Sequence, residues 1–265
     1  MVFRKPHRVG LKGDALRGVR GYPLELISDR HMAGIHASEV VGLHKTAVTP
    51  AEVVYTAIAN LAANTLTPSF VGVAIGTAVV GRRVVVGTHP YYSNDVPTLS
   101  SMAIAGGAAA EVIDPGAKTS VLVGEIWDRQ VDTGTTTTIA PVWGGAATSY
   151  SNGIVVWEVH NVSGGATDTD EHFLPSGVGT NSVTVTVPDG GVVLAYGTFS
   201  SDPTDITWGG VDEDVAETLM CDGDCAIYQA GASRQYLVGG DKTITMLVST
   251  TTLARHLLVA VYSPA

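Results

Sequence analysis

The sequence predicts an all-β protein: an antiparallel β-sandwich or jelly roll preceded by an extended N-terminal arm. From Ser69 onward, short segments rich in Val and Thr recur roughly every ten to fifteen residues, with Gly and Pro turn signals between them. Before Thr67, neither the helical nor the strand period of apolar residues is sustained. We therefore divide the chain into an arm, residues 1–66, and a β-sandwich domain, residues 67–265.

The arm differs from the rest of the chain in charge. Residues 1–45 hold eight Lys and Arg against four Asp and Glu, whereas residues 46–265 hold seven against twenty-one. A basic segment without apolar periodicity folds only against a partner. We expect the arm to be extended and to contact other chains, where its basic residues meet acidic groups. The candidate partner-binding residues are Arg4, Lys5, Arg8, Lys12, Arg17 and Arg20.

One stretch inside the arm carries a helix-start signal. Thr49 has the chemistry of an N-cap, Pro50 suits the first helical position, and Glu52 supplies an acid in the first turn. The Ala- and Leu-rich run that ends at Ala63 is therefore predicted to be a short helix. Its density of β-branched residues leaves a strand as the alternative.

The segments after the arm differ in the spacing of their apolar residues. Residues 84–86 and 154–159 are continuous apolar runs, typical of strands buried on both faces. Residues 181–187 alternate Val with Ser and Thr, which predicts a strand with one buried face. Pro188-Asp189-Gly190-Gly191 favours a hairpin turn, with residues 191–199 as the partner strand. Residues 243–249 and 256–262 are predicted as the last strands.

Composition argues against several classes of function. The net charge of −10 argues against nucleic-acid binding by the sandwich. No run of eighteen apolar residues predicts a membrane span, and no signal-peptide pattern follows the basic N-terminus. We therefore expect synthesis in a cytoplasm and no membrane partner. Only 15% of residues are charged, which suits a surface covered by neighbours, as in a homo-oligomer such as a trimer.

The sequence contains no recognisable catalytic motif. Nucleophile-elbow, H-E-x-x-H, P-loop and dinucleotide-binding patterns are all absent. The acidic runs at residues 168–171 and 212–214 are interpreted as solvated strand connections, not as a glycosidase carboxylate pair. The histidines match no metal-ligand spacing. We expect no enzyme activity, no cofactor and no metal site.

Cysteine and tryptophan residues leave narrower questions. Cys221 and Cys225 could be unpaired loop thiols, a local disulfide, or half of a metal site. Trp127 and Trp157 lie within predicted strands and are expected in the core. Trp143 and Trp208 each precede a Gly-Gly pair, so they are the candidates for an exposed ligand platform on which a sugar could stack.

A set of short motifs also occurs in a particular order. Ile75-Gly76-Thr77-Ala78 leads into Arg82-Arg83-Val84-Val85-Val86-Gly87, and later motifs are Gly134-Thr135, Gly153-Ile154-Val155-Val156-Trp157, residues 182–187, Gly190-Gly191-Val192-Val193 and Thr207-Trp208-Gly209-Gly210. In this order they resemble β-sandwich modules of virion proteins from tailed bacteriophages and phage-like particles. The resemblance covers about residue 68 to the end.

This resemblance implies a structural role in a virion and supplies no catalytic residues. Together with the basic arm, it favours a capsid-associated decoration (cement) protein or head-spike protein, whose arm binds other virion proteins. The alternative is a tail or tail-fibre protein whose sandwich binds a carbohydrate or a receptor.

Overall fold

The computed structural model of the chain describes residues 48–61, 65–92, 98–116, 123–144, 149–176, 179–200, 205–220, 226–249 and 254–265. These residues form antiparallel strands and no helix, so the prediction of an all-β antiparallel fold is confirmed. In this part of the chain nothing resembles a membrane-crossing helix. The compact unit formed by the strands runs from Val48 to Ala265.

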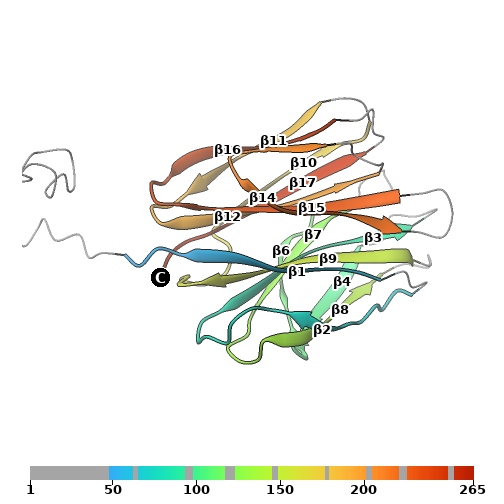
Figure 1. The fold of residues 1–265 in the computed structure, drawn as a ribbon, viewed down its shortest axis with the longest axis horizontal. Coiled ribbons are helices and arrows are strands. Elements are labelled where there is room, and N and C mark those ends of the chain that lie inside the picture. Colours follow the sequence, from blue (N-terminus) through green and yellow to red (C-terminus); the bar gives the residue numbers. More distant parts are fainter. Residues whose placement is uncertain are drawn as a thin grey trace, which may run out of the picture. The chain divides into compact units, whose positions relative to one another are not determined.

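The strands of the described residues form four sheets (Figure 1). Outer sheet I has the order β2 (Phe70–Ala74), β8 (Thr136–Trp143), β4 (Leu99–Ile104) and β5 (Gly107–Ala108). Inner sheet I has the order β1 (Glu52–Leu61), β9 (Ser149–His160), β3 (Arg83–Tyr92), β7 (Glu125–Gln130) and β6 (Ala110–Ile113). Inner sheet II has the order β10 (Asp168–Leu174), β17 (Arg255–Tyr262), β12 (Gly191–Phe199), β15 (Ala226–Tyr236) and β14 (Asp212–Met220). Outer sheet II has the order β11 (Thr180–Val187), β16 (Gly240–Val248) and β13 (Ile206–Gly209).

The four sheets are stacked as layers, with a separate apolar core in each of the three spaces between them (Figure 1). Outer sheet I packs on inner sheet I through a core that includes Met102 and Val156. The two inner sheets share a core centred on Trp157 and Tyr196. Inner sheet II packs on outer sheet II around Val185 and Val259. The fold is therefore two β-sandwiches placed back to back.

The spacing of apolar residues matches the layer to which each strand belongs. β12 and β17 lie in an inner sheet and are buried along their whole length, because a core covers each face. β11 lies in an outer sheet and alternates strictly between exposed and buried positions. The continuous run at residues 84–86, predicted to be buried on both faces, lies in β3 of inner sheet I and has no exposed surface.

The two inner sheets approach closely where glycine faces an aromatic ring. A Cβ on Gly87 would lie 2.6 Å from the ring of Tyr196, and one on Gly231 would lie 2.7 Å from the ring of Trp157. Real Cβ atoms essentially never show such distances. These two glycines therefore leave space for the rings that fill the central core.

The sequence left a short helix and a strand open for the segment that ends at Ala63, and the strand is correct, because residues 52–61 form β1. β1 pairs antiparallel with β9 from Glu52 to Leu61, with a bulge near Thr56, whose Oγ1 donates to the carbonyl of Val156 at 3.0 Å. Pairing along a whole strand outweighs the local helix-start signal, and the β-branched residues favour it. The compact unit thus includes β1 and begins at Val48, within the range 1–66 assigned to the arm.

The turn at residues 188–191 forms as predicted, but it does not join a hairpin. Gly191 N donates to the carbonyl of Pro188 at 2.9 Å, and Gly190 has φ of 75°, a conformation that glycine adopts without strain. The strand before the turn, β11, pairs with β16, whereas β12 after it pairs with β15 and β17. The turn therefore carries the chain from outer sheet II to inner sheet II.

Candidate functional site

The candidate partner-binding residues of the arm and both cysteines lie outside the described residues. They are Arg4, Lys5, Arg8, Lys12, Arg17 and Arg20, and Cys221 and Cys225. The structure thus leaves the prediction of an extended arm in contact with other chains open. It does place the acidic, histidine and tryptophan candidates.

Trp143 is not an exposed platform, contrary to the prediction. Its side chain is 2% exposed and lies in the core between outer and inner sheet I, and its backbone N–H donates to Leu66 O at 2.8 Å. Trp208 is half-buried and packs against the core of the second sandwich. It lines a shallow pocket of about 370 Å³ together with Asp212 and Glu213, so Trp208 is partly accessible. Trp127 and Trp157 are core residues, as predicted.

The acidic run at residues 168–171 lies in strand β10, not in a loop, and it joins two sheets. Asp168 Oδ2 accepts from Thr186 N at 2.7 Å, Asp170 Oδ2 accepts from Thr184 N at 3.3 Å, and His172 Nδ1 accepts from Ser182 N at 2.9 Å. Alternate side chains of β10 therefore replace a partner strand for the edge of β11. These groups are occupied in holding outer sheet II against inner sheet II.

The acidic run at residues 212–214 also lies in a strand, at the start of β14. Asp214 Oδ2 accepts a hydrogen bond from Trp157 Nε1 at 2.8 Å. Burial raises the pKa of Asp214 above its usual range, and the charge of Asp212 adds to this effect, while hydrogen bonds from Trp157 and Ser233 oppose it.

A groove of about 410 Å³ runs beside this acidic segment, between β1 and strands β14 and β15. Glu52, Asp212 and Asp214 line it, with Arg234 as its single cation among the lining residues. Its lining carries three acids and one base, a net charge of −2 when all are ionised. We call it the acidic groove. Its first lining residue in the sequence is Glu52, and the compact unit starts four residues earlier, at Val48.

The two acidic runs do not converge on one site. β10 and β14 are the opposite edges of inner sheet II, separated by β17, β12 and β15. Four strand spacings of about 4.8 Å place the runs roughly 19 Å apart. In the described part of the chain, Asp168, Asp170 and His172 thus do not share a cleft with Asp212, Glu213 and Asp214, and this argues against a glycosidase-type pair built from them.

A second polar pocket of about 410 Å³ lies over an ion pair between β3 and β7. Arg83 Nε donates to Asp128 Oδ2 at 3.0 Å and Nη2 to Oδ1 at 2.5 Å, while the Tyr262 hydroxyl donates to Oδ2 at 2.9 Å. Burial lowers the pKa of Arg83, but the hydrogen bonds and charge of Asp128 outweigh it, and the net shift is upward. Because each charge is matched by the other, neither group is available as a catalytic acid or base.

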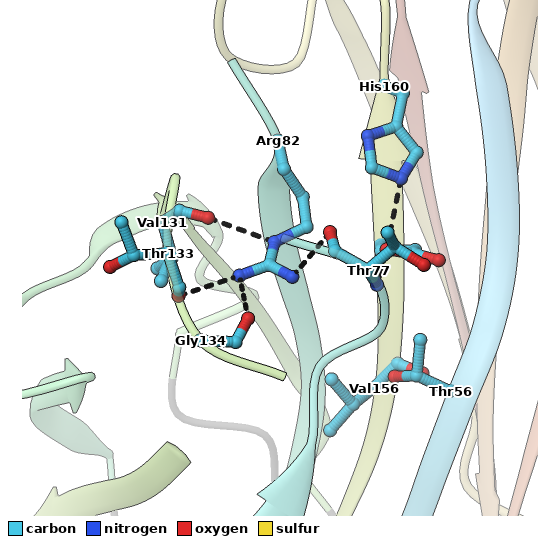
Figure 2. Close-up of polar contacts among 9 residues, drawn as sticks. Thr56, Thr77, Arg82, Val131, Thr133, Gly134, Val156 and His160 are labelled. Atoms are coloured by element: carbon cyan, nitrogen blue, oxygen red, sulfur yellow. Dashed lines mark hydrogen bonds and ion pairs between the residues drawn. The ribbon is translucent and has the colours of Figure 1, made fainter. Parts of the chain in front are cut away.

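Arg82 forms a buried polar centre next to this pair (Figure 2). Its guanidinium donates to the carbonyls of Thr77, Val131, Thr133 and Gly134 at 2.7 to 3.0 Å. Burial lowers its pKa, and Glu158 and Asp132 oppose that shift. The carboxylate of Glu158 in turn accepts from Thr77 N at 2.9 Å and lies 3.0 Å from His160 Nε2. This network fixes two loops at the start of β3, the one before β3 and the one after β7.

Two further polar groups are buried within the inner sheets. Glu125 is 1% exposed and accepts from Leu99 N and Trp127 Nε1, each at 2.8 Å, and burial raises its pKa to about 7. His89 is fully buried beside the Tyr196 hydroxyl, with its Nδ1 2.6 Å from that oxygen, and burial lowers its pKa to about 3. Neither group lines a pocket described above.

Sequence reasoning missed these buried charges, although the sequence carried a signal for them. Arg82, Glu125 and Asp128 each lie next to or inside an apolar strand segment, where a charge is expensive unless it is matched. That position indicates a buried network but does not identify the partner, because Asp128 meets Arg83 only through the pairing of β3 with β7.

The described residues contain no group of three or more His, Cys, Asp or Glu side chains that could hold a metal ion. Comparison with protein-family models, with curated proteins and with solved structures finds no match to this chain. A functional proposal therefore rests on the charge distribution, the fold and the chemistry of the residues themselves.

Proposed function

We propose that this chain is a structural protein of a tailed-bacteriophage or phage-like virion, a capsid-associated decoration (cement) or head-spike protein. Its basic N-terminal segment binds other virion proteins, and the stacked sandwiches form the body displayed on the particle. The chain is made in the host cytoplasm and carried in the virion.

The observation that carries this proposal is the division of charge at the boundary of the compact unit. Residues 1–47 hold eight basic and four acidic residues, a net charge of +4, and residues 48–265 hold seven and twenty-one, a net charge of −14. These sum to the −10 of the whole chain. Opposite charges steer and orient association between molecules.

The same division supports homo-oligomerisation, with a trimer as one form. The acidic groove beside β1 offers the basic segment of a second copy a surface of opposite sign. Exposed ion pairs contribute only about 0–1 kcal/mol each, so several in register are needed to fix docking. The six basic residues Arg4, Lys5, Arg8, Lys12, Arg17 and Arg20 provide such a series.

The use of the acidic residues supports a structural role over a catalytic one. Asp168 and Asp170 hold the edge of β11, and Asp128 neutralises Arg83. A hydrolase would need such carboxylates free and convergent in a pocket. We accordingly propose that the chain has no enzyme activity of its own.

The alternative is a tail or tail-fibre protein whose sandwich binds a carbohydrate. Burial of Trp143 removes one of its two predicted platforms. Trp208 still lines a pocket with two carboxylates, and an indole beside acids is suitable chemistry for stacking and hydrogen-bonding a sugar. Binding of the purified protein to a glycan array, lost in Trp208→Ala, would favour this alternative.

Labelling of intact particles tests the main proposal. An antibody raised against the sandwich and carried on gold should decorate the heads of particles at regular positions in electron micrographs. Labelling restricted to tails would replace the head assignment with the tail alternative. Particles that carry no label and no copy of the chain by mass spectrometry would overturn both.

A further inference from the structure

Arg255 is a buried arginine at one end of the second sandwich. It is the first residue of β17 and is 1% exposed. It lies opposite Phe199 of β12 and Leu174 of β10 in the sheet register. Alternate residues Leu257 and Val259 belong to the core between inner and outer sheet II, so the period of the strand directs Arg255 toward the same space.

The guanidinium of Arg255 has no hydrogen-bond partner among the described residues. Its Nε, Nη1 and Nη2 atoms are all buried and unsatisfied. Gly179 lies close to this guanidinium, because a Cβ added to Gly179 would be 3.5 Å from Arg255 Nη2. Neither Leu174 nor Phe199, its register neighbours, has a side chain that can accept a hydrogen bond.

Two other arginines among the described residues, the buried Arg82 and the partly buried Arg83, show what such a group requires. Arg82 is equally buried and donates to four carbonyls, as Figure 2 shows, and Arg83 forms a two-point ion pair with Asp128. Arginine does not lose its proton in proteins, so Arg255 cannot escape the problem by becoming neutral. A buried charge without a counter-ion is strongly destabilising.

Polar atoms on the facing sheet share this lack of partners. Trp208 of β13 and Asn181 of β11 both lie opposite Met246 of β16. The Trp208 Nε1 donor and the Asn181 Oδ1 acceptor are buried and have no hydrogen-bond partner among the described residues. The Trp208 ring approaches Gly197, which lies opposite Leu257, two residues along β17 from Arg255. The core between inner sheet II and outer sheet II thus carries unmatched donors from both sheets.

We propose that Arg255 binds a small oxyanion, a phosphate or carboxylate group, at this end of the core between inner sheet II and outer sheet II. The planar guanidinium supplies parallel N–H donors that match two oxygens of such a group. Trp208 Nε1 is a further donor on the opposite sheet. Asn181 Oδ1 needs a donor, which hydrogen phosphate carries and a carboxylate lacks, so phosphate is the better match. This inference is independent of the proposed role in a virion.

Thermal unfolding of the full-length protein at constant ionic strength tests the site. The midpoint Tm is followed while chloride is replaced by inorganic phosphate in one series and by acetate in another. A ligand at about 100 times its Kd lowers the unfolding equilibrium constant roughly 100-fold, which raises Tm by about 5–10 °C for a domain of this size. We expect a saturable rise with phosphate, and a smaller or equal rise with acetate.

Two variants assign the response to the residue. Arg255→Met keeps the volume but removes the charge, so it should abolish the response and unfold no earlier than the unsubstituted protein in chloride. Arg234→Met, which changes an exposed arginine of β15 in the same sheet, should keep the response.

Three results would overturn the proposal. They are equal Tm values in chloride, phosphate and acetate, a phosphate response that persists in Arg255→Met, and a response lost equally in Arg234→Met. If Arg255→Met does not fold, equilibrium dialysis of phosphate against the unsubstituted protein decides the question, and absence of saturable binding refutes the site.

Discussion

Glu125 should make the stability of the protein fall as pH rises toward neutrality. Its carboxyl lies in β7 with 1% exposure, and burial raises its pKa from 4.5 to about 7 in the folded state. Between these values the folded protein binds a proton that the unfolded chain has released. Stability is therefore greatest below pH 4.5 for this group and is lost as pH rises through the folded-state pKa.

The expected size of the effect follows from the difference between the two pKa values. Each unit corresponds to about 1.4 kcal/mol, so a shift from 4.5 to about 7 removes roughly 3 kcal/mol of unfolding free energy across the window. The two hydrogen bonds from Leu99 N and Trp127 Nε1 favour the ionised form but do not outweigh burial. The loss of unfolding free energy is therefore caused by burial of the ionised carboxylate.

Urea unfolding at half-unit pH steps from 4.5 to 8 measures this effect, with Glu125→Gln as the control. Glutamine offers one oxygen to the two donors, so the variant carries a loss of hydrogen bonding that does not depend on pH. The informative quantity is the difference between the two proteins, which should change by roughly 3 kcal/mol across the window. A difference that is constant with pH would contradict the raised pKa, because Glu125 would then ionise at its ordinary pKa in the folded protein.

Three substitutions test other parts of the structure by chemical denaturation. Arg82→Met removes four hydrogen bonds to carbonyls and should lower the free energy of unfolding by about 3–5 kcal/mol. The control, Arg234→Met at an exposed position, should change it by less than about 0.5 kcal/mol. Similar small losses for both variants would contradict the network of Figure 2. Gly231→Ala places a methyl group against the Trp157 ring and should destabilise the protein by about 1–3 kcal/mol. Gly164 has open space around it, so Gly164→Ala should be nearly neutral. Equal stability of the two variants would argue against the close approach of the inner sheets. Trp143→Ala should destabilise by about 3–5 kcal/mol because Trp143 is a core residue. An unchanged unfolding midpoint would contradict the burial of its side chain.

The sequence predicted the fold class and the burial of particular strands because those depend on local spacing. The continuous run at residues 84–86 and the alternation at residues 181–187 predicted one strand covered on both faces and one covered on a single face, as observed. The number of layers did not follow, because it depends on which strands pair. Residues 188–191 have the chemistry of a hairpin turn, yet β11 and β12 belong to different sheets.

The candidate site was less predictable because its chemistry depends on tertiary contacts. Sequence spacing predicts that Asp168 and Asp170 are solvated loop acids. In the fold, β10 lies beside the edge of β11, and both carboxylates accept hydrogen bonds from its backbone. Trp143 precedes a Gly-Gly pair, a turn signal that says nothing about where the indole points, and the sheet places it in the core. Arg82 and Arg255 are both buried, but the described residues bring four carbonyl acceptors to Arg82 and none to Arg255.

The proposed function requires the basic N-terminal segment to attach the sandwich to a particle. The most direct measurement is incorporation into particles of a full-length variant with Ser at Arg4, Lys5, Arg8, Lys12, Arg17 and Arg20, quantified by mass spectrometry of purified particles. We predict that the variant keeps the unfolding midpoint of the unsubstituted protein but is absent from particles. Incorporation at the normal copy number would contradict it.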